Sequence, residues 1–127
     1  MAGRSIAKKL FLKEGVTLLL VDAPRGYKKL LGSIPKGAVV RGGNAGPAHI
    51  IQLFVRSRKE LERRVRPARA ALAPGGTLWV TYPKGSSTLK SDINRDSIAA
   101  YARTLGMRPV AIISVDDDWS ALRLKTA

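Results

Sequence analysis

Val16-Thr-Leu-Leu-Leu-Val21 is the stretch that decides the fold class, because every residue in it except the threonine is apolar. A strand with one solvated face alternates apolar and polar side chains, whereas a strand covered on both faces is apolar almost throughout. The run is also too short to cross a membrane or to form the core of an export signal. It therefore predicts a strand of a parallel sheet that lies between two layers of helices.

The rest of the chain alternates strand-like and helix-like segments, as such a sheet requires. The glycine-rich stretch 42–47 is expected to be a loop. Apolar runs predict further strands at 38–41, 49–55, 77–82, 110–115 and 120–125. Amphipathic spacing and end signals predict helices within 5–15, 26–31, 57–72 and 92–105.

The longest predicted helix begins at Ser57, which forms the capping-box pattern Ser-x-x-Glu with Glu60. Its apolar residues recur three and four positions apart, which places them on one face of the helix. Pro67 lies inside this segment and predicts a kink or a split. Pro74-Gly75-Gly76 then predicts a hard stop before the next strand.

The last two predicted strands are separated only by residues 116–119. Parallel neighbours need a crossover of a dozen or more residues, so this short connection predicts an antiparallel hairpin. The predicted fold class is α/β, a three-layer Rossmann-like sheet of about six strands. The sheet is mostly parallel, with an antiparallel C-terminal hairpin strand, and residues 1–127 form a single domain.

The composition excludes several kinds of site. The chain has 127 residues and no cysteine, which excludes zinc–thiolate sites, iron–sulfur clusters, disulfides and cysteine nucleophiles. The only histidine, His49, opens a predicted strand, and its default role is structural. With neither cysteine nor an export signal, we expect a cytoplasmic protein.

The chain is strongly basic, with a net charge of +14 and a pI near 11.0. Sixteen basic and four acidic residues lie in 1–69, against seven and five in 70–127. Such an excess favours a polyanionic partner such as nucleic acid. A need for solubility, or a high-GC genome that prefers arginine, explains the excess equally well. Aromatic residues make up only 6% and do not form a base-stacking platform, so a dedicated single-strand reader is not expected.

Two sets of motifs carry a resemblance. The first set consists of the terminal hairpin and the segment Leu72-Ala-Pro-Gly-Gly-Thr-Leu-Trp-Val80. It resembles part of the core of class I S-adenosylmethionine-dependent methyltransferases. The match covers residues 49–127 of this chain, which correspond to the second half of that core. Over nearly the entire chain, other motifs resemble a family of small bacterial proteins of unknown function that is itself similar to a shortened methyltransferase. These motifs are Phe54–Leu61, Tyr82–Lys84, Asp92–Asp96 and Asp118–Arg123. The resemblance implies a fold and supplies no activity.

The first half departs from the methyltransferase pattern where the cofactor binds. The resemblance implies a glycine-rich turn after the first strand, but here Asp22-Ala-Pro-Arg-Gly26 holds one glycine and a proline. It also implies a ribose-binding carboxylate at the end of the second strand, where this chain has Arg41. Residues 42–47 are too few for the usual third strand and its helix. We therefore expect the nucleoside groove to be lost and no cofactor to be bound.

Open α/β sheets bind ligands at the carboxyl ends of their strands, so the candidate site lies at that edge. Ser57 stands at a helix N-terminus, where free N–H groups favour an anion. Residues 84–88 add a loop with an ammonium and hydroxyl groups. Alternatively, Ser57 only caps its helix and the loop is a solvated connection. The candidate ligand-binding residues are Asp22, Arg25, Gly26, Arg41, Arg56, Ser57, Lys84, Ser86 and Ser87.

Basic residues cover the outer face of the helix that follows Ser57. They are interpreted either as a solvated face or as a surface that tracks phosphates. The acidic turn 116–118 either holds a cation weakly or serves only the hairpin, and no metal is expected. The candidate basic surface consists of Arg58, Lys59, Arg63, Arg64 and Arg66.

Three functions follow from these observations. The leading hypothesis is a non-catalytic binding domain for an anionic ligand or nucleic acid, with a degenerate S-adenosylmethionine motif. The first alternative is a methyltransferase with an unorthodox cofactor loop. The second is a structural or regulatory interaction domain, in which the short edge at 38–41 pairs with another chain or with a second copy in a homo-oligomer. No catalytic residue is assigned.

Overall fold

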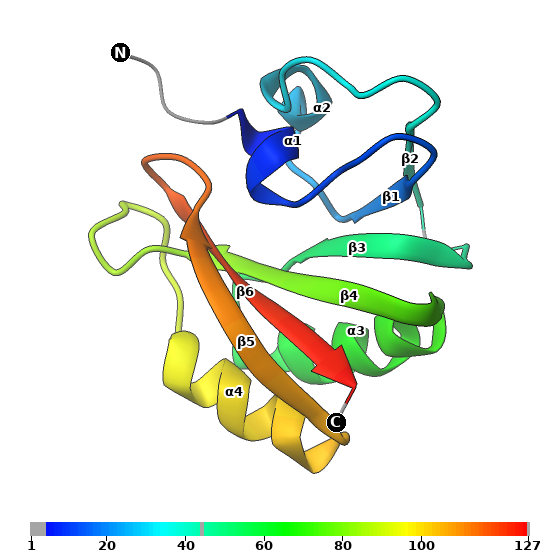
Figure 1. The fold of residues 1–127 in the computed structure, drawn as a ribbon. Helices are drawn as coiled ribbons and strands as arrows, with labels where there is room; N and C mark the ends of the chain where they lie inside the picture. The colour runs from blue at the N-terminus through cyan, green and yellow to red at the C-terminus, as the bar shows by residue number, and fades with distance from the viewer. Residues whose placement is uncertain (1–4, 44, 127) are drawn as a thin grey trace.

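The computed structural model describes residues 5–43 and 45–126 and contains one six-stranded sheet (Figure 1). The strands are β1 (Thr17–Val21), β2 (Val39–Gly42), β3 (Ala48–Phe54), β4 (Leu72–Pro83), β5 (Met107–Ser114) and β6 (Trp119–Thr126). Their order across the sheet is β2-β1-β3-β4-β6-β5.

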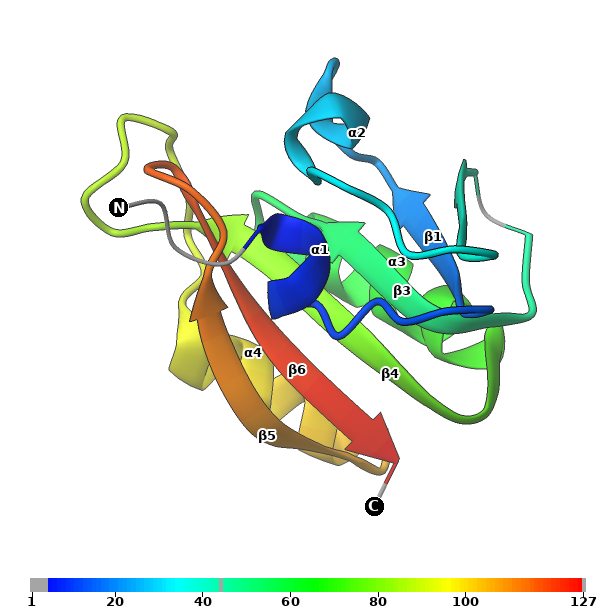
Figure 2. The same cartoon turned by 45° about the horizontal axis from the view of Figure 1, so that its top comes forward.

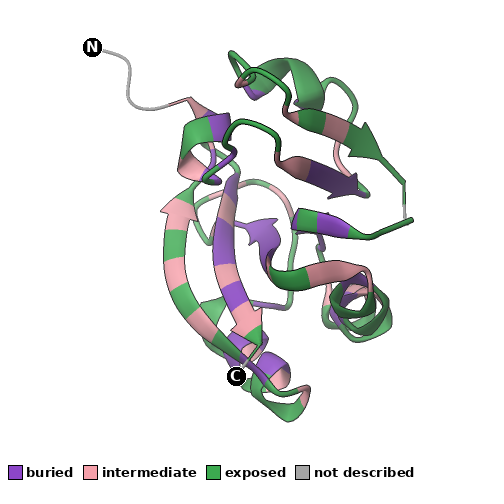
Figure 3. Ribbon diagram, turned by 45° about the vertical axis from the view of Figure 1, so that its right-hand side comes forward, coloured by how far each residue is buried: buried purple, intermediate pink, exposed green. Residues whose placement is uncertain are grey.

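Strands β1 to β4 are parallel to one another, and β6 is antiparallel to both β4 and β5. The predicted α/β sheet and its C-terminal hairpin are therefore confirmed. Strand β6 lies between β4 and β5, a placement that the sequence left open. Strand β5 is consequently an edge, and after Met107 it carries only half-buried and exposed residues (Figure 3).

Helices lie on both faces of the sheet (Figures 1 and 2). Leu18 and Leu20 of β1 pack with the two short N-terminal helices, whereas Leu19 and Val21 pack with the two longer ones. Both faces of β1 are thus buried, which explains why its sequence is apolar throughout. No helix of the described residues is long and apolar enough to cross a membrane. The helices are α1 (Ile6–Lys9), α2 (Tyr27–Leu30), α3 (Arg58–Ala70) and α4 (Arg95–Thr104).

Helix α3 runs through Pro67 without being split, so that part of the prediction is wrong. A proline inside a helix removes one backbone hydrogen bond. Here Leu61 and Val65 before it and Ala68 after it are all buried in one core, and their packing holds the two halves together. The Ser57 cap is confirmed, because its hydroxyl accepts a hydrogen bond from the Glu60 N–H at 3.1 Å.

The predicted stop at residues 74–76 is also wrong, because these residues lie within β4. Leu72 pairs with Ala48, and Thr77 already pairs with Ile50, so the intervening residues bulge out of register. A Cβ on Gly76 would lie 2.8 Å from the carbonyl oxygen of His49. Glycine at this position lets the two backbones approach, so the bulge interrupts the ladder without ending the strand.

Candidate ligand-binding site

The carboxyl ends of β1 and β2 flank a cavity of about 700 Å³ on the side of the sheet that carries α2. It is lined by Leu20, Asp22, Ala23, Pro24, Gly26, Tyr27, Lys28, Lys29, Gly42 and Gly43. We expected the nucleoside groove to be lost, and the structure has a hollow at the carboxyl ends of these strands.

The loop from β1 to α2 explains why the hollow persists. Asp22 has a φ of 58° and Gly26 a φ of 81°, so both lie in the left-handed region. Aspartate tolerates this region better than most non-glycine residues. The N–H of Tyr27 then donates to the carbonyl of Pro24 at 3.0 Å. Two left-handed residues, only one of them glycine, thus make a tight turn after β1.

The charges at this cavity are mainly basic. The carboxylate of Asp22 pairs with the guanidinium of Arg64 at 3.3 Å, with both side chains partly exposed. Lys28 and Lys29 line the cavity, and Gly42 and Gly43 stand at the end of β2. No second carboxylate is present among the described residues that line it. The glycines allow a ligand to approach the backbone closely, and the lysines favour a negatively charged group on it.

Arg41, placed by sequence at the end of the second strand, does not line this cavity. It pairs in register with Leu19, whereas the cavity lies on the Leu20 face. Its guanidinium donates to the carbonyl of Pro47 at 2.9 Å and so braces the loop between β2 and β3. Arg25 is exposed on the β1–α2 loop and is likewise not among the lining residues.

The N-terminus of α3 is occupied by the protein's own groups. The N–H of Arg58 donates to a carboxylate oxygen of Asp92 at 2.7 Å, and the N–H of Arg56 donates to Glu60 at 2.8 Å. The guanidinium of Arg56 lies 5.7 Å from the centre of the Trp119 ring. Ser57 caps the helix, and Arg56 contacts only groups of the protein itself. These contacts agree with the alternative in which Ser57 serves the helix rather than a ligand.

Lys84 and Ser86 line a second cavity of about 450 Å³ at the carboxyl end of β4. Ser87 serves the loop itself, because its hydroxyl donates to Asp118 at 2.9 Å and accepts from the N–H of Leu89. The candidate residues therefore fall into two cavities and a set of structural contacts rather than into one site.

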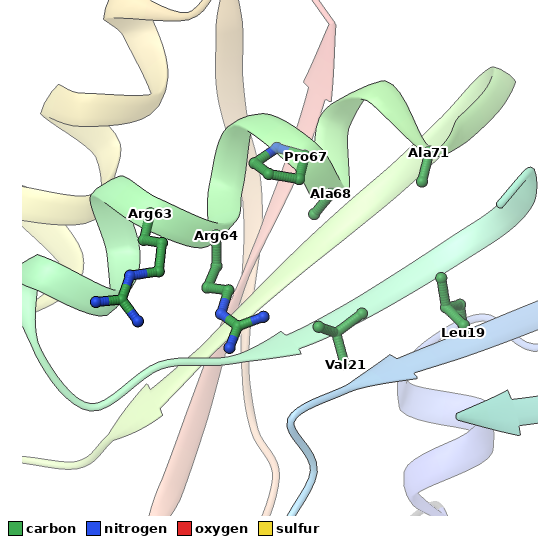
Figure 4. A pocket seen from close by; sticks show the side chains of 7 residues that line it. All are labelled: Leu19, Val21, Arg63, Arg64, Pro67, Ala68 and Ala71. Atoms are coloured by element: carbon green, nitrogen blue, oxygen red, sulfur yellow. The ribbon is translucent and has the colours of Figure 1, made fainter. Parts of the chain in front are cut away.

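Residues of the candidate basic surface also have separate roles. Arg58 pairs with Glu62 at 3.1 Å, and Arg64 pairs with Asp22. Figure 4 shows Arg63 and Arg64 on α3 above Leu19 and Val21 of β1, where they line a cavity of about 300 Å³ on the opposite face of the sheet. Lys59 and Arg66 are exposed.

Sequence reasoning missed Tyr27, which lines the first cavity and is buried. Its ring meets Phe54 edge to face at 4.7 Å, and its hydroxyl is sealed without a hydrogen-bond partner among the described residues. Burial raises the pKa of Tyr27 well above its usual range, so the hydroxyl is protonated at neutral pH. The only sequence feature that pointed to Tyr27 was its position next to Gly26. That position does not predict whether the tyrosine side chain faces the cavity.

Comparisons with known proteins agree on the fold. A methyltransferase from Aquifex aeolicus, described as dependent on S-adenosylmethionine, has a TM-score of 0.63 and 14% identity over 96% of this chain and 88% of its own. The DhpI–SAH complex has a TM-score of 0.62 and 10% identity, covering 91% of this chain and 78% of that chain. The pyocyanin biosynthetic protein PhzM has a TM-score of 0.67 and 12% identity, over 96% and 53%.

The chain has the class I S-adenosylmethionine-dependent methyltransferase fold. No protein-family model matches the sequence, and no curated protein matches it significantly. Only residues 43–47 separate β2 from β3, which is too short for the third strand and helix that the resemblance implied. Within the described part of the chain, β2 is one edge strand of the sheet, and β5 is the other.

Proposed function

We propose that the protein binds an adenosyl ligand, with S-adenosylmethionine as the first candidate, in the cavity between the β1–α2 loop and the end of β2. The proposal rests on the cavity, whose volume of about 700 Å³ leaves room for a nucleoside. It lies at the carboxyl ends of the strands, where open α/β sheets bind ligands. The methyltransferase fold supports it, as does a structural neighbour described as a complex with SAH.

The lining fits an adenosyl group in part. Leu20 and Pro24 offer apolar surface to a purine ring, and the backbones of Gly42 and Gly43 allow it to approach closely. Lys28 and Lys29 are placed to meet the carboxylate of the methionine moiety. The only carboxylate among the described lining residues is that of Asp22, and it pairs with Arg64, so the ribose hydroxyls lack a free carboxylate partner. One missing charged hydrogen bond corresponds to about 1.5–3 kcal/mol, or roughly ten- to hundredfold weaker binding.

S-adenosylmethionine, when bound, supplies an activated methyl group. The role that we assign to this chain's residues is to hold the ligand: the left-handed turn at Asp22 shapes one wall, and the glycines of β2 shape the other. The Asp22–Arg64 pair fixes the loop to α3. Transfer of that methyl group to an acceptor would be a further activity, beyond the ligand binding that we propose.

Calorimetric titration with SAH, which has no methyl group to transfer, tests ligand binding separately from chemistry. We expect saturable heat with one site per chain and a dissociation constant in the micromolar range. Adenosine should compete with SAH, because the purine and ribose fill the cavity. Absence of heat with SAH, S-adenosylmethionine and adenosine at millimolar concentration would reject the proposal.

A second candidate function is binding of a polyanion by the basic surface. Lys59, Arg63 and Arg66 lie on α3 without a salt bridge to a described acidic residue, and the excess of charge is concentrated in residues 1–69. Anisotropy of a labelled duplex should show binding that weakens as salt rises, and the slope should fall when these three residues are replaced by glutamine. A signal independent of salt, or none at low ionic strength, would count against it.

A further inference from the structure

The second cavity, at the carboxyl end of β4, has the features of a site for a small anion. It lies where β4 ends, β6 begins and α4 starts, and its lining is mostly polar. The groups that matter are Tyr82, Lys84, Ser86, Arg95 and Asp96. This site shares no lining residue with the cavity proposed for the adenosyl ligand.

Tyr82 carries the argument. Its side chain is buried, with only 6% of the residue exposed, and it belongs to the core beneath α3 and α4. Its hydroxyl makes no hydrogen bond to any described residue and, unlike the Tyr27 hydroxyl, it is not fully enclosed by protein atoms. The ring is therefore fixed by packing, while its donor faces the cavity without a partner. A hydroxyl that is held at the tip of a packed ring and has no partner in the protein is available to a ligand or to water.

Cationic groups and free N–H groups surround this hydroxyl. The ammonium of Lys84 is held in place by a hydrogen bond to the Ser114 hydroxyl at 2.5 Å. The guanidinium of Arg95 pairs only with its neighbour Asp96, at 3.5 Å, and both side chains are largely exposed. Such a pair is weak in water, so Arg95 is free to meet a ligand.

The start of α4 adds two backbone donors. The side chain and carbonyl of Asn94 satisfy the N–H groups of Ser97 and Ile98. The N–H groups of Arg95 and Asp96 have no acceptor in the described structure, and the positive end of the helix lies beside them. The carboxylate of Asp96 opposes an anion, but Lys84 and Arg95 outweigh its charge.

We propose that this cavity binds the phosphate group of a small phosphate monoester. The Tyr82 hydroxyl, the two N–H groups and the side chains of Lys84 and Arg95 are the donors that a tetrahedral dianion requires. Ile112, which is exposed, lines the same cavity and offers apolar surface to the organic part of the ligand. The site is independent of the proposed adenosyl cavity.

The test is a titration of inorganic phosphate into the isotopically labelled protein at constant ionic strength, followed by amide chemical shifts. We expect saturable shifts at Arg95 and Asp96. Tyr82→Phe removes one neutral donor and should weaken binding about three- to tenfold, whereas Arg95→Gln should weaken it about tenfold or more. The same spectra report whether each variant is folded.

Arg103→Gln is the matched control, because Arg103 is an exposed arginine on the same helix outside the cavity. It should change phosphate affinity less than about twofold, which separates a site from the general attraction of a basic protein. Equal losses in Arg95→Gln and Arg103→Gln, or no saturation at Arg95 and Asp96, would overturn the proposal. Gly42→Leu should leave the phosphate shifts unchanged, so failure of SAH binding would not affect this result.

Discussion

Gly42→Leu is expected to weaken SAH binding strongly while leaving the protein folded. Gly42 lines the proposed adenosyl cavity and has an ordinary backbone conformation, and the nearest heavy atom to a Cβ placed there is the Leu20 carbonyl oxygen at 3.9 Å. A leucine side chain therefore enters open space inside the cavity. We expect calorimetry to show a loss of about 2 kcal/mol or more in binding free energy, which is roughly thirtyfold or more in affinity.

Gly85→Leu is the matched control for this variant. Gly85 also lacks a positive φ, and a Cβ at this position would have no heavy atom within 4 Å, but it lies at the second cavity. Gly26 and Gly43 are unsuitable, because their φ values of 81° and 116° would strain any side chain. Gly85→Leu should bind SAH like the wild type. If Gly42→Leu also binds SAH like the wild type, the ligand does not occupy this cavity.

Trp79→Ala is expected to cause the largest loss of stability, about 3 kcal/mol in the free energy of unfolding. Trp79 is fully buried in the core on the α1–α2 face. Its ring stacks on Phe11 with centroids 6.4 Å apart, and the Arg123 guanidinium lies 4.6 Å from the Phe11 ring. Truncation leaves a large cavity and removes the stack that joins the N-terminal segment to β4.

The indole N–H of Trp79 has no hydrogen-bond partner in the described structure, so its removal offsets part of this loss. Trp79→Phe keeps most of the ring contacts and should cost less than about 1.5 kcal/mol. Urea unfolding followed by far-ultraviolet circular dichroism measures both variants. A loss below about 1 kcal/mol for Trp79→Ala would mean that the α1–α2 core does not depend on this ring.

The sheet could be predicted because its signals are local. The run 16–21 is apolar at every position but one, and β1 is buried on both faces. The short connection 116–119 permits only a hairpin, whatever the rest of the chain does. What local signals could not give was the position of β6, because a hairpin can add to a sheet by either of its strands.

Pro67 and the Pro74-Gly75-Gly76 segment were misjudged because tertiary packing overrides local preference. Buried residues on either side of Pro67 hold α3 together, and the close approach of Gly76 to His49 keeps β4 in the sheet. Both effects involve residues far apart in sequence. A proline or glycine predicts a local free-energy cost to the helix or strand that contains it. It does not predict the tertiary contacts that outweigh this cost.

The candidate site was predicted less well than the fold, for a related reason. Asp22 and Gly26, two of the candidate ligand-binding residues, line a cavity where the groove was expected to be absent. Asp22 adopts a left-handed conformation, which its residue type alone does not predict. Tyr82 was missed because an apolar strand predicts a buried ring and does not predict an unpartnered hydroxyl at its tip.

The most direct test of the central claim is an amide chemical-shift titration of the labelled protein with SAH. If the adenosyl ligand binds between the β1–α2 loop and the end of β2, saturable shifts will concentrate at residues 22–28 and at Gly42 and Gly43. In Gly42→Leu the same shifts will require far higher SAH concentrations. Shifts confined to α3 or to the loop 84–88, or no shifts at millimolar SAH, would contradict the account.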